Sequence, residues 1–384
     1  MPATRILLPS IIDPRTHRGG AGTVTRSILQ VLGQEPLSAR IEHVLPTSTE
    51  GKFHRARQFA SVTGSLVSPL PSKALLTYSR RFLNEVKGLL DKQQFDLVLI
   101  NGADLLWLLP HLPPGIPRIL LAHNIEHQLY LSQINGLYRG SLLLRGVLMR
   151  DWRRLRDYEM SGMRRIENII FLSNQDAEFA HGEITGTNTL LVPPIFDYQR
   201  PERVGSTDTE AGLQIGFMGN FGWWPNREGL HWFLKEVFPH TSGDTLLHLF
   251  GEQSNEAAPR HSRIVKHGFL AKTQDIWPIC DFMICPIHSG GGVNVKFAEA
   301  VYNRVPVLAT SFGARGLPLQ SDPGIVLLNS AAEWVAFLRS PGARALRLRR
   351  LPSAIAQRFA MESHAKSVQS FVGDAMRRAR SLTA

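Results

Sequence analysis

The sequence predicts an α/β protein built from two Rossmann-like domains in tandem. The chain has 384 residues, which suits two domains of ordinary size better than one. An apolar content of 43% is enough to fill two cores. Short apolar runs alternate with helix-like segments from end to end, which is typical of parallel sheets covered on both faces by crossover helices.

The first half of the chain contains the strands of one predicted sheet. We expect strands at Arg5–Pro9, Phe95–Asn101, Arg118–Ala122, Asn168–Leu172 and Leu190–Pro194. Ser173 follows the fourth of these runs and is a good helix N-cap. Residues 1–196 therefore form the predicted N-terminal domain. The polar residues 197–212, which include few large hydrophobic side chains, form the predicted linker.

The same alternation restarts after the linker. We expect strands at Leu213–Met218, Thr245–Phe250, Arg263–His267, Asp281–Pro286 and Val305–Thr310, with a helical pattern over Pro225–Phe238. Residues 213–350 are the predicted C-terminal domain. Residues 351–384 are a predicted helical tail, with one or two helices between Pro352 and Arg380.

Composition restricts the partners and the compartment. A net charge of +11 favours anionic partners, which include nucleic acid, membrane headgroups and phosphorylated small molecules. No apolar run approaches the roughly 18 residues of a membrane-spanning helix, and the N-terminus lacks the apolar stretch of a signal peptide. We therefore predict a cytoplasmic protein. Its two cysteines, Cys280 and Cys285, are expected to be buried small hydrophobic residues.

The segment Pro286–Ala300 has the most informative pattern in the chain. Three glycines, Gly290–Gly292, follow a predicted strand and precede a predicted helix, so the backbone can approach a ligand closely there. The free N–H groups at the start of that helix form an anion site, for which a diphosphate is a natural ligand. Lys296 lies in the first turn, and Glu299 lies on the same face and can accept ribose hydroxyls. Alternatively, the glycines make only a tight turn, and Lys296 and Glu299 form a surface pair.

This pattern resembles the signature of the family 4 (group 1) retaining glycosyltransferases of the GT-B fold. The matching positions are Pro286, Gly290–Gly292, Lys296, Glu299, Ala300, Val305–Thr310 and Gly313–Gly316, with further similar stretches at Gly216–Leu230, Leu249–Gly251 and Val265–Phe269. The resemblance is specific over residues 213–318 and looser before them. It implies two Rossmann-like domains that face each other across a cleft, with the C-terminal helix returning to the N-terminal domain.

The resemblance also implies an activity. We expect a retaining, metal-independent glycosyltransferase of the hexosyltransferase type, with a nucleoside-diphosphate sugar as co-substrate and no cofactor. The acceptor would be a glycan, a lipid-linked saccharide or another molecule. The alternatives are a GT-B-like nucleotide-sugar epimerase and a non-catalytic protein that binds the nucleotide sugar.

The expected catalytic residues are His123, Lys296 and Glu299. Lys296 and the helix N-terminus would stabilise the departing diphosphate, Glu299 would hold the ribose, and His123 would lie near the transferred sugar. The backbone near Gly268 and Phe269 would meet the base. The expected donor-binding positions are Gly19, Gly20, Asn220, Gly268, Phe269, Gly290, Gly291, Gly292, Val293 and Asn294, and no residue is expected to bind a metal.

Two departures from the family pattern affect this assignment. Many relatives have two glutamates eight positions apart, and the first of them falls on Gly291 here. Many relatives also hold the diphosphate with Arg and Lys after the first strand of the C-terminal domain, where this chain has Asn220–Trp224. We expect Lys296 to supply the missing charge, together with Arg315.

Two short segments of the N-terminal half are further candidates. His17–Gly22 follows the first strand, and it would either face the donor phosphates or be an ordinary βα turn. His123 and Asn124 follow a strand at the end where open α/β sheets place ligands; the alternative is a structural histidine beside a helix-capping Asn124. The segment His123–His127 also matches the His-x-x-Glu-His of some zinc peptidases, which would require it to lie inside a helix.

The segment Arg139–Arg165 is strongly basic, with eight arginines against three acidic residues and leucines between them. It is either a helix at an anionic membrane surface, which would suit a lipid-linked acceptor, or one or two solvated helices packed on the sheet. A peripheral position on the inner face of the cell membrane follows from the first interpretation. No recognition motif accompanies the charge, so we do not expect nucleic acid as a partner.

Overall fold

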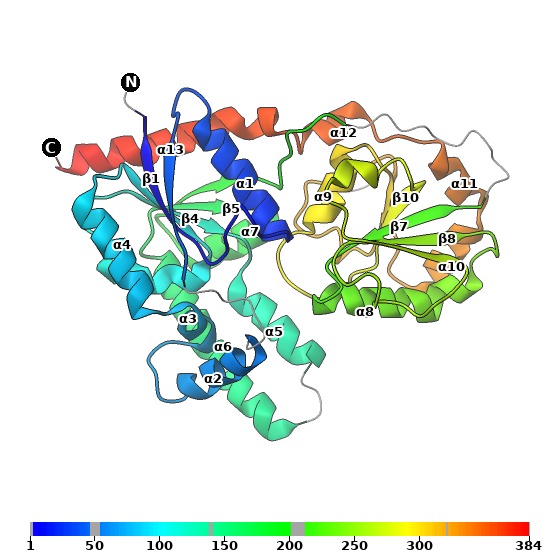
Figure 1. Ribbon diagram of the computed structural model, residues 1–384, viewed down its shortest axis with the longest axis horizontal. Helices are drawn as coiled ribbons and strands as arrows, with labels where there is room; N and C mark the ends of the chain where they lie inside the picture. The colour runs from blue at the N-terminus through cyan, green and yellow to red at the C-terminus, as the bar shows by residue number, and fades with distance from the viewer. Residues whose placement is uncertain (1–2, 47–53, 138–140, 201–211, 320–321, 384) are drawn as a thin grey trace. The chain divides into compact units, whose positions relative to one another are not determined.

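The structure is a computed structural model that describes residues 3–46, 54–137, 141–200, 212–319 and 322–383. The chain divides into two compact units (Figure 1). Unit 1 consists of Met1–Pro193 and His364–Ala384, and unit 2 consists of Pro194–Ser363. Each unit is built around its own six-stranded sheet.

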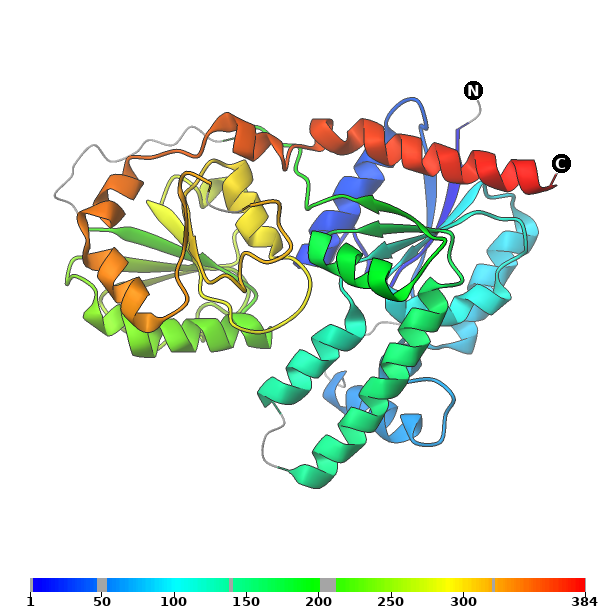
Figure 2. The ribbon, with the colours of Figure 1, turned by 180° about the vertical axis from the view of Figure 1, so that it is seen from behind.

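Unit 1 contains a parallel sheet in the strand order β2-β1-β3-β4-β5-β6. Its strands are β1 (Arg5–Pro9), β2 (Arg40–Val44), β3 (Leu97–Asn101), β4 (Arg118–Ala122), β5 (Asn168–Phe171) and β6 (Asn188–Leu191). The central strands β3, β4 and β5 are buried almost throughout, because helices lie on both faces of the sheet (Figures 1 and 2).

Helices cover the sheet of unit 1 and extend beyond it. They are α1 (Gly20–Gly33), α2 (His54–Ser65), α3 (Ser72–Thr77), α4 (Arg80–Lys92), the 3-10 helix η1 (Ala103–His111), α5 (Glu126–Leu137), α6 (Leu142–Met163), α7 (Asn174–Glu183) and most of α13 (Met361–Thr383). The predicted N-cap of α7 is confirmed, since the Ser173 side chain accepts a hydrogen bond from the Asp176 amide. Figures 1 and 2 show that α5 and α6 form a hairpin that projects from the sheet.

Unit 2 contains a second parallel sheet in the order β12-β11-β10-β7-β8-β9. Its strands are β7 (Gln214–Met218), β8 (Leu246–Phe250), β9 (Ile264–Gly268), β10 (Phe282–Cys285), β11 (Val307–Ala309) and β12 (Ile325–Leu327). Its helices are α8 (Trp224–Trp232), the π-helix η2 (Phe233–Val237), the 3-10 helices η3 (Phe238–His240) and η4 (Thr273–Asp275), α9 (Val295–Tyr302), α10 (Ala331–Arg339), α11 (Pro341–Arg347) and α12 (Ser353–Gln357).

The prediction of two α/β sheets is confirmed, but it did not include two of the strands. In strand β2 the exposed residues Arg40 and Glu42 alternate with half-buried ones. The strand therefore lacks the continuous apolar run of a central strand. Strand β12 has only three residues. Both lie at sheet edges, where one side of the strand pairs with nothing in the sheet and the hydrophobic signal is weak. The helical pattern of Pro225–Phe238 is continuous in the sequence, yet α8 ends at Trp232 and continues as a π turn.

Several residues next to the two boundaries of the predicted C-terminal domain pack into a core. Phe196 belongs to the core of unit 2, and Tyr198 packs against it. Residues 201–211 of the predicted linker lie outside the described residues. The predicted tail divides: Ile355 and Phe359 join the core of unit 2, whereas residues from His364 onward belong to unit 1.

The C-terminal helix α13 is held to unit 1 by polar contacts at several points along its length. The Gln369 amide donates to the Val31 carbonyl at the end of α1, at 3.1 Å. Near its end, Arg378 donates to the side chain of Asn168 at 2.9 Å, and Arg380 forms an ion pair with Asp96 at 3.2 Å.

Candidate active site

The strand orders place one switch point in each unit. In unit 2, the chain runs outward from β7 to one side through β8 and β9, and to the other side through β10 and β11. Ligands of open α/β sheets bind outside the carboxyl ends of the strands at such a point. The loop after β7 contains Asn220, and the loop after β10 contains the glycines Gly290–Gly292. The fold therefore brings the two loops that the sequence singled out to neighbouring strand ends.

The glycine loop leads directly into α9. Gly290 and Gly292 have positive φ angles of 119° and 63°, which a side chain would make unfavourable. The Asn294 side chain caps α9 by accepting a hydrogen bond from the Phe297 amide at 3.2 Å. Asn294 also donates to the Cys285 sulfur at 2.9 Å, so its side chain is committed to the turn. The Asn294 side chain is therefore occupied, and only the backbone of this residue is available to a ligand.

Lys296 lies in the first turn of α9, as predicted, and its side chain is half-buried. Burial lowers the pKa of its ammonium group to about 8, although the charges of Glu299 and Glu252 oppose the change. Within the part of the chain that the structure describes, no residue forms a hydrogen bond or ion pair with the Lys296 side chain. A positive charge thus stands at a helix N-terminus, where an anionic ligand would stabilise it.

Glu299 lies one turn further along α9 and is only 7% exposed, so it does not form a surface pair with Lys296. Its Oε1 atom accepts a hydrogen bond from the Thr273 hydroxyl at 2.6 Å and another from the Tyr198 hydroxyl at 3.2 Å. The sequence did not point to these two partners, because they lie on a 3-10 turn and in the segment predicted as linker. A buried carboxylate held by hydroxyl donors can also receive the hydroxyls of a sugar ring.

The loop after β7 is held by its own side chains. The Asn220 side chain donates to Glu252 at 2.7 Å and accepts from the Gly222 amide at 2.8 Å, while its carbonyl accepts from Asn226 at 2.9 Å. Asn220 therefore shapes the loop. The charge of its partner Glu252 acts on the ammonium group of Lys296.

Two further predicted positions lie at the carboxyl end of β9. Gly268 has a positive φ of 69°, and its amide donates to the Ser254 hydroxyl at 3.1 Å. Phe269 comes next in the chain, and its side chain is 43% exposed. An exposed aromatic side chain beside a glycine turn can stack on a planar base.

In unit 1 the corresponding switch point lies between β1 and β3. Here His123, which follows β4, is 8% exposed, and its Nε2 lies 2.7 Å from the Asn101 Oδ1 at the end of β3. The Asn101 amide nitrogen donates to the Ser10 hydroxyl at 2.7 Å, so Asn101 Oδ1 accepts from the histidine. Burial lowers the pKa of His123 to about 4, which keeps the imidazole neutral at physiological pH.

The other ring nitrogen of His123, Nδ1, is buried and has no hydrogen-bond partner among the described residues. In the tautomer that donates from Nε2, Nδ1 carries a lone pair and is an acceptor. Asn101 could not be identified from the sequence as the partner of His123, because an asparagine that ends a strand is common.

The glycines after β1 allow close packing of His17. A Cβ atom on Gly19 would lie 2.5 Å from the His17 ring, and one on Gly22 would lie 2.3 Å from the His17 carbonyl oxygen. Gly19 is the N-cap of α1, with Gly20 as its first residue, and no side chain caps this helix. The Gly19 amide donates to His17 Nδ1 at 3.1 Å. His17 is close enough to His123 to influence it electrostatically.

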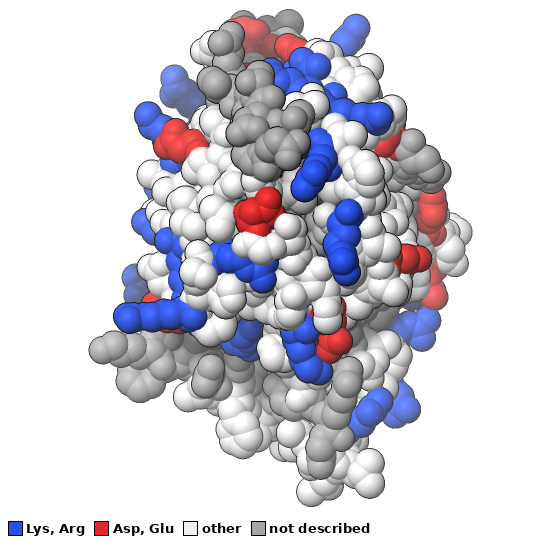
Figure 3. Space-filling model, turned by 90° about the vertical axis from the view of Figure 1, so that its right-hand side faces the viewer, with Lys and Arg blue, Asp and Glu red and all other residues white. Residues whose placement is uncertain are grey.

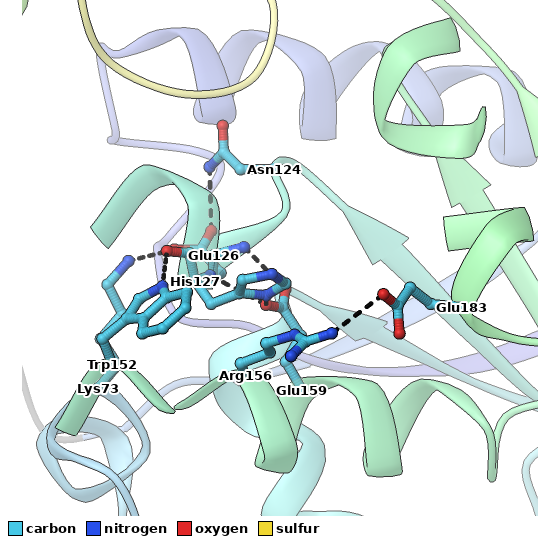
Figure 4. A network of polar contacts seen from close by, with 8 residues as sticks. All are labelled: Lys73, Asn124, Glu126, His127, Trp152, Arg156, Glu159 and Glu183. Atoms are coloured by element: carbon cyan, nitrogen blue, oxygen red, sulfur yellow. Dashed lines mark hydrogen bonds and ion pairs between the residues drawn. The ribbon is translucent and has the colours of Figure 1, made fainter. Parts of the chain in front are cut away.

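The second half of the His-x-x-Glu-His segment belongs to a buried polar network (Figure 4). Glu126 pairs with Lys73 of α3 and accepts from Asn124 at 3.0 Å. His127 Nδ1 lies 2.7 Å from Glu159 of α6, which also accepts the backbone amides of Glu126 and His127. The network ties α3, α5 and α6 together.

The zinc interpretation does not fit these contacts. His123 precedes α5, and only Glu126 and His127 lie inside the helix. His123, Glu126 and His127 each point to a different polar partner, as described above. Among the described residues, no group of three or more His, Cys, Asp and Glu side chains has an arrangement that could hold a metal ion.

The described part of the basic segment consists mainly of α6, the second helix of the α5–α6 hairpin, and the surface of this hairpin is apolar as well as basic. Leu142 and Leu143 at the start of α6 are 90% and 83% exposed, and Leu137 at the end of α5 is 50% exposed. Further along α6, Leu148 and Leu155 are buried in a small core with Tyr130 and Ile134 of α5. The hairpin is therefore packed on one side and leaves leucines exposed near its end.

Some arginines of this segment have structural contacts instead of a free surface. Arg154 donates to the backbone carbonyls of Ser65, the last residue of α2, and of Ser68, which lies just beyond it. Arg156 pairs with Glu183 at 3.1 Å. Arg145, Arg150 and Arg153 are exposed, and Arg145 also donates to the Asn135 side chain of α5 at 3.0 Å.

Two further observations concern the length of the helices and the distribution of surface charge. None of the helices in the described residues is long and apolar enough to cross a membrane. On the face shown in Figure 3, lysines and arginines are scattered with acidic residues between them, and they form no continuous basic stripe of the kind that nucleic acid would follow.

Comparison with solved structures defines the class of fold. The chain aligns with sucrose-phosphate synthase from Thermosynechococcus elongatus at a TM-score of 0.61 and 14% identity, over 99% of this chain and 98% of the other. It aligns with HepE from Anabaena, solved with UDP, at a TM-score of 0.60 and 14% identity, over 98% and 100%. The lipopolysaccharide outer core galactosyltransferase WaaB aligns at 0.54 and 9% identity, over 97% and 99%. The chain has the GT-B fold.

The match to a family model lies within unit 2. Residues 212–339 match the model described as glycosyl transferases group 1. This stretch contains the loop after β7, the glycine loop and α9, which are the parts of the site described above. No curated protein sequence matches the chain.

Proposed function

We propose that this protein transfers a hexosyl group from a nucleoside-diphosphate sugar to an acceptor. The observation that carries the proposal is the placement of Lys296 beside the glycine loop, at the N-terminus of α9 and at the switch point of unit 2. The diphosphate would bind to the amides of Gly291, Gly292 and Val293, and Glu299 would receive the ribose hydroxyls. The base would lie against Gly268 and Phe269.

The reaction needs stabilisation of a leaving group more than it needs a strong nucleophile. Negative charge increases on the diphosphate as the sugar bond breaks, and a preorganised cation with oriented amides stabilises that charge. Lys296 and the α9 N-terminus supply both, which is consistent with chemistry that uses no metal. Retention at the anomeric carbon is implied by the resemblance to family 4 enzymes and is part of the proposal.

Unit 1 would supply the acceptor side and contacts to the transferred sugar. His123 is neutral and has an acceptor nitrogen without a protein partner, so it suits a sugar hydroxyl better than a phosphate. Gly19 and Gly20 would offer backbone amides at the start of α1. The acceptor class would be a glycan or a lipid-linked saccharide.

The test is a screen of nucleoside-diphosphate sugars by thermal shift, followed by product analysis. HepE, which has the same fold, was solved with UDP-glucose, so uridine nucleotides come first in the panel. We expect stabilisation by at least one donor and a new glycosidic product with the anomeric configuration of the donor. An isomerised donor would favour an epimerase, and binding without any reaction would favour a non-catalytic protein.

We further propose that the protein associates peripherally with an anionic membrane surface through the α5–α6 hairpin. Exposed leucines near the end of the hairpin adjoin the exposed Arg145 and Arg150, and the sequence from Gln128 to Arg150 contains no acidic residue. Apolar side chains that enter a bilayer interface and arginines that face lipid phosphates are the two signals which stable surface binding needs. Such a position would suit a lipid-linked acceptor on the inner face of the cell membrane.

Vesicle co-sedimentation tests the membrane proposal. We expect binding to anionic vesicles that weakens as salt rises, and a loss of about tenfold or more in binding when Leu142 and Leu143 are both replaced by serine. The matched control is Leu348→Ser, which changes a leucine that is 58% exposed in unit 2. Equal recovery on neutral and anionic vesicles, or equal loss in both variants, would contradict the proposal. Arg154 is left intact because its contacts to α2 are structural.

A further inference from the structure

The carboxylate of Glu299 is oriented by two side chains from different parts of unit 2. The hydroxyls of Thr273 and Tyr198 converge on the same oxygen, Oε1, at 2.6 Å and 3.2 Å. Two donors on one oxygen fix the rotation of the carboxylate plane as well as its position. Neither donor belongs to α9, so the helix alone does not determine where the Glu299 carboxylate points.

Tyr198 is itself held in place. Asn303, the C-cap of α9, donates to the Tyr198 hydroxyl at 2.7 Å, which leaves the hydroxyl proton to point at Glu299. The Tyr302 hydroxyl donates to the Tyr198 carbonyl at 2.8 Å, and the two rings pack edge to face at 5.2 Å. Burial and the nearby Glu299 charge raise the pKa of Tyr198, so the phenol stays protonated. It can therefore donate throughout the physiological pH range.

We propose that Tyr198 and Thr273 are positioning residues, whose hydroxyls orient the Glu299 carboxylate to receive the ribose hydroxyls of the donor. This inference rests on the proposed function, because it takes Glu299 as the ribose ligand. A preorganised acceptor loses less conformational freedom when the ligand binds, so the gain appears only for ligands that have ribose hydroxyls. The segment before β7 thus contributes to the donor site and does not only connect the two units.

The experiment compares two ligands by calorimetry: the best-binding nucleoside diphosphate from the panel and its 2′,3′-dideoxy analogue. The parent protein should bind the ribonucleotide more tightly. We expect Tyr198→Phe to weaken the ribonucleotide about three- to tenfold, in line with the loss of one hydrogen bond to a charged group, and to leave the dideoxy analogue unchanged. Thr273→Val should behave in the same way, because its hydroxyl meets the same oxygen.

The matched control is Tyr78→Phe, which removes the hydroxyl of a tyrosine in unit 1 that is 42% exposed. It should leave the ratio of the two affinities as in the parent, whatever it does to the melting temperature. Equal weakening of both ligands by Tyr198→Phe and Thr273→Val would make their role one of packing and would overturn the inference. A parent protein that does not distinguish the two ligands would instead refute the ribose assignment of Glu299, before any variant is measured.

Discussion

Replacement of Lys296 by alanine is expected to lower turnover by a factor on the order of 100 or more. The ammonium stands at the N-terminus of α9 beside the glycine loop, and no described residue neutralises it through an ion pair. Only interactions that are stronger in the transition state than in the ground state speed the chemical step. The loss of one preorganised charge-stabilising group has this magnitude in other enzymes. The measurement is turnover at saturating donor, with a separate binding constant for the nucleoside diphosphate, which should change less.

Two further variants make the Lys296 result specific. Lys296→Arg should recover only part of the activity, because a planar guanidinium does not replace a compact ammonium. Lys235→Ala, which removes an exposed lysine paired with Glu236, should behave as the parent. Turnover of Lys296→Ala within a few-fold of the parent would mean that another cation meets the leaving-group charge, with Arg18 and Arg315 as the next candidates.

The pH dependence provides an independent check on Lys296. Its pKa of about 8 means that the free protein carries the charge below that pH and loses it above. The parameter kcat/KM reports groups of the free enzyme, so it should fall as pH rises through about 8. Lys296→Arg should remove this fall, since arginine stays protonated. A fall that persists in Lys296→Arg would assign the titration to another group.

Replacement of Glu299 by alanine is expected to weaken donor binding by about 1–3 kcal/mol, because a charged acceptor of the ribose hydroxyls is lost. Glu299 is buried and hydrogen-bonded, so the alanine variant also leaves the hydroxyls of Tyr198 and Thr273 without their acceptor. Glu299→Gln keeps an acceptor oxygen for them and separates the two effects. Calorimetry with the nucleoside diphosphate measures the loss, and unchanged affinity in both variants would refute the ribose assignment.

Much of the site could be predicted because its signals are local. The glycine loop and α9 follow from consecutive residues, since glycine permits positive φ and Asn294 can cap a helix. The position of Lys296 in the first turn follows from where that helix begins. Strands buried on both faces were found from their apolar runs, whereas the edge strands β2 and β12 were missed because an edge needs fewer apolar residues.

The sequence by itself determined that this protein has two α/β units and a glycine loop followed by a helix that presents Lys296 and Glu299. The tertiary structure decided which groups those residues meet. The pair of Tyr198 and Glu299 is separated by 101 positions, the pair of Lys73 and Glu126 by 53, and the pair of Asn101 and His123 by 22. Local periodicity carries no information about such pairs, because they depend on which strands become neighbours and on the paths of the loops between them.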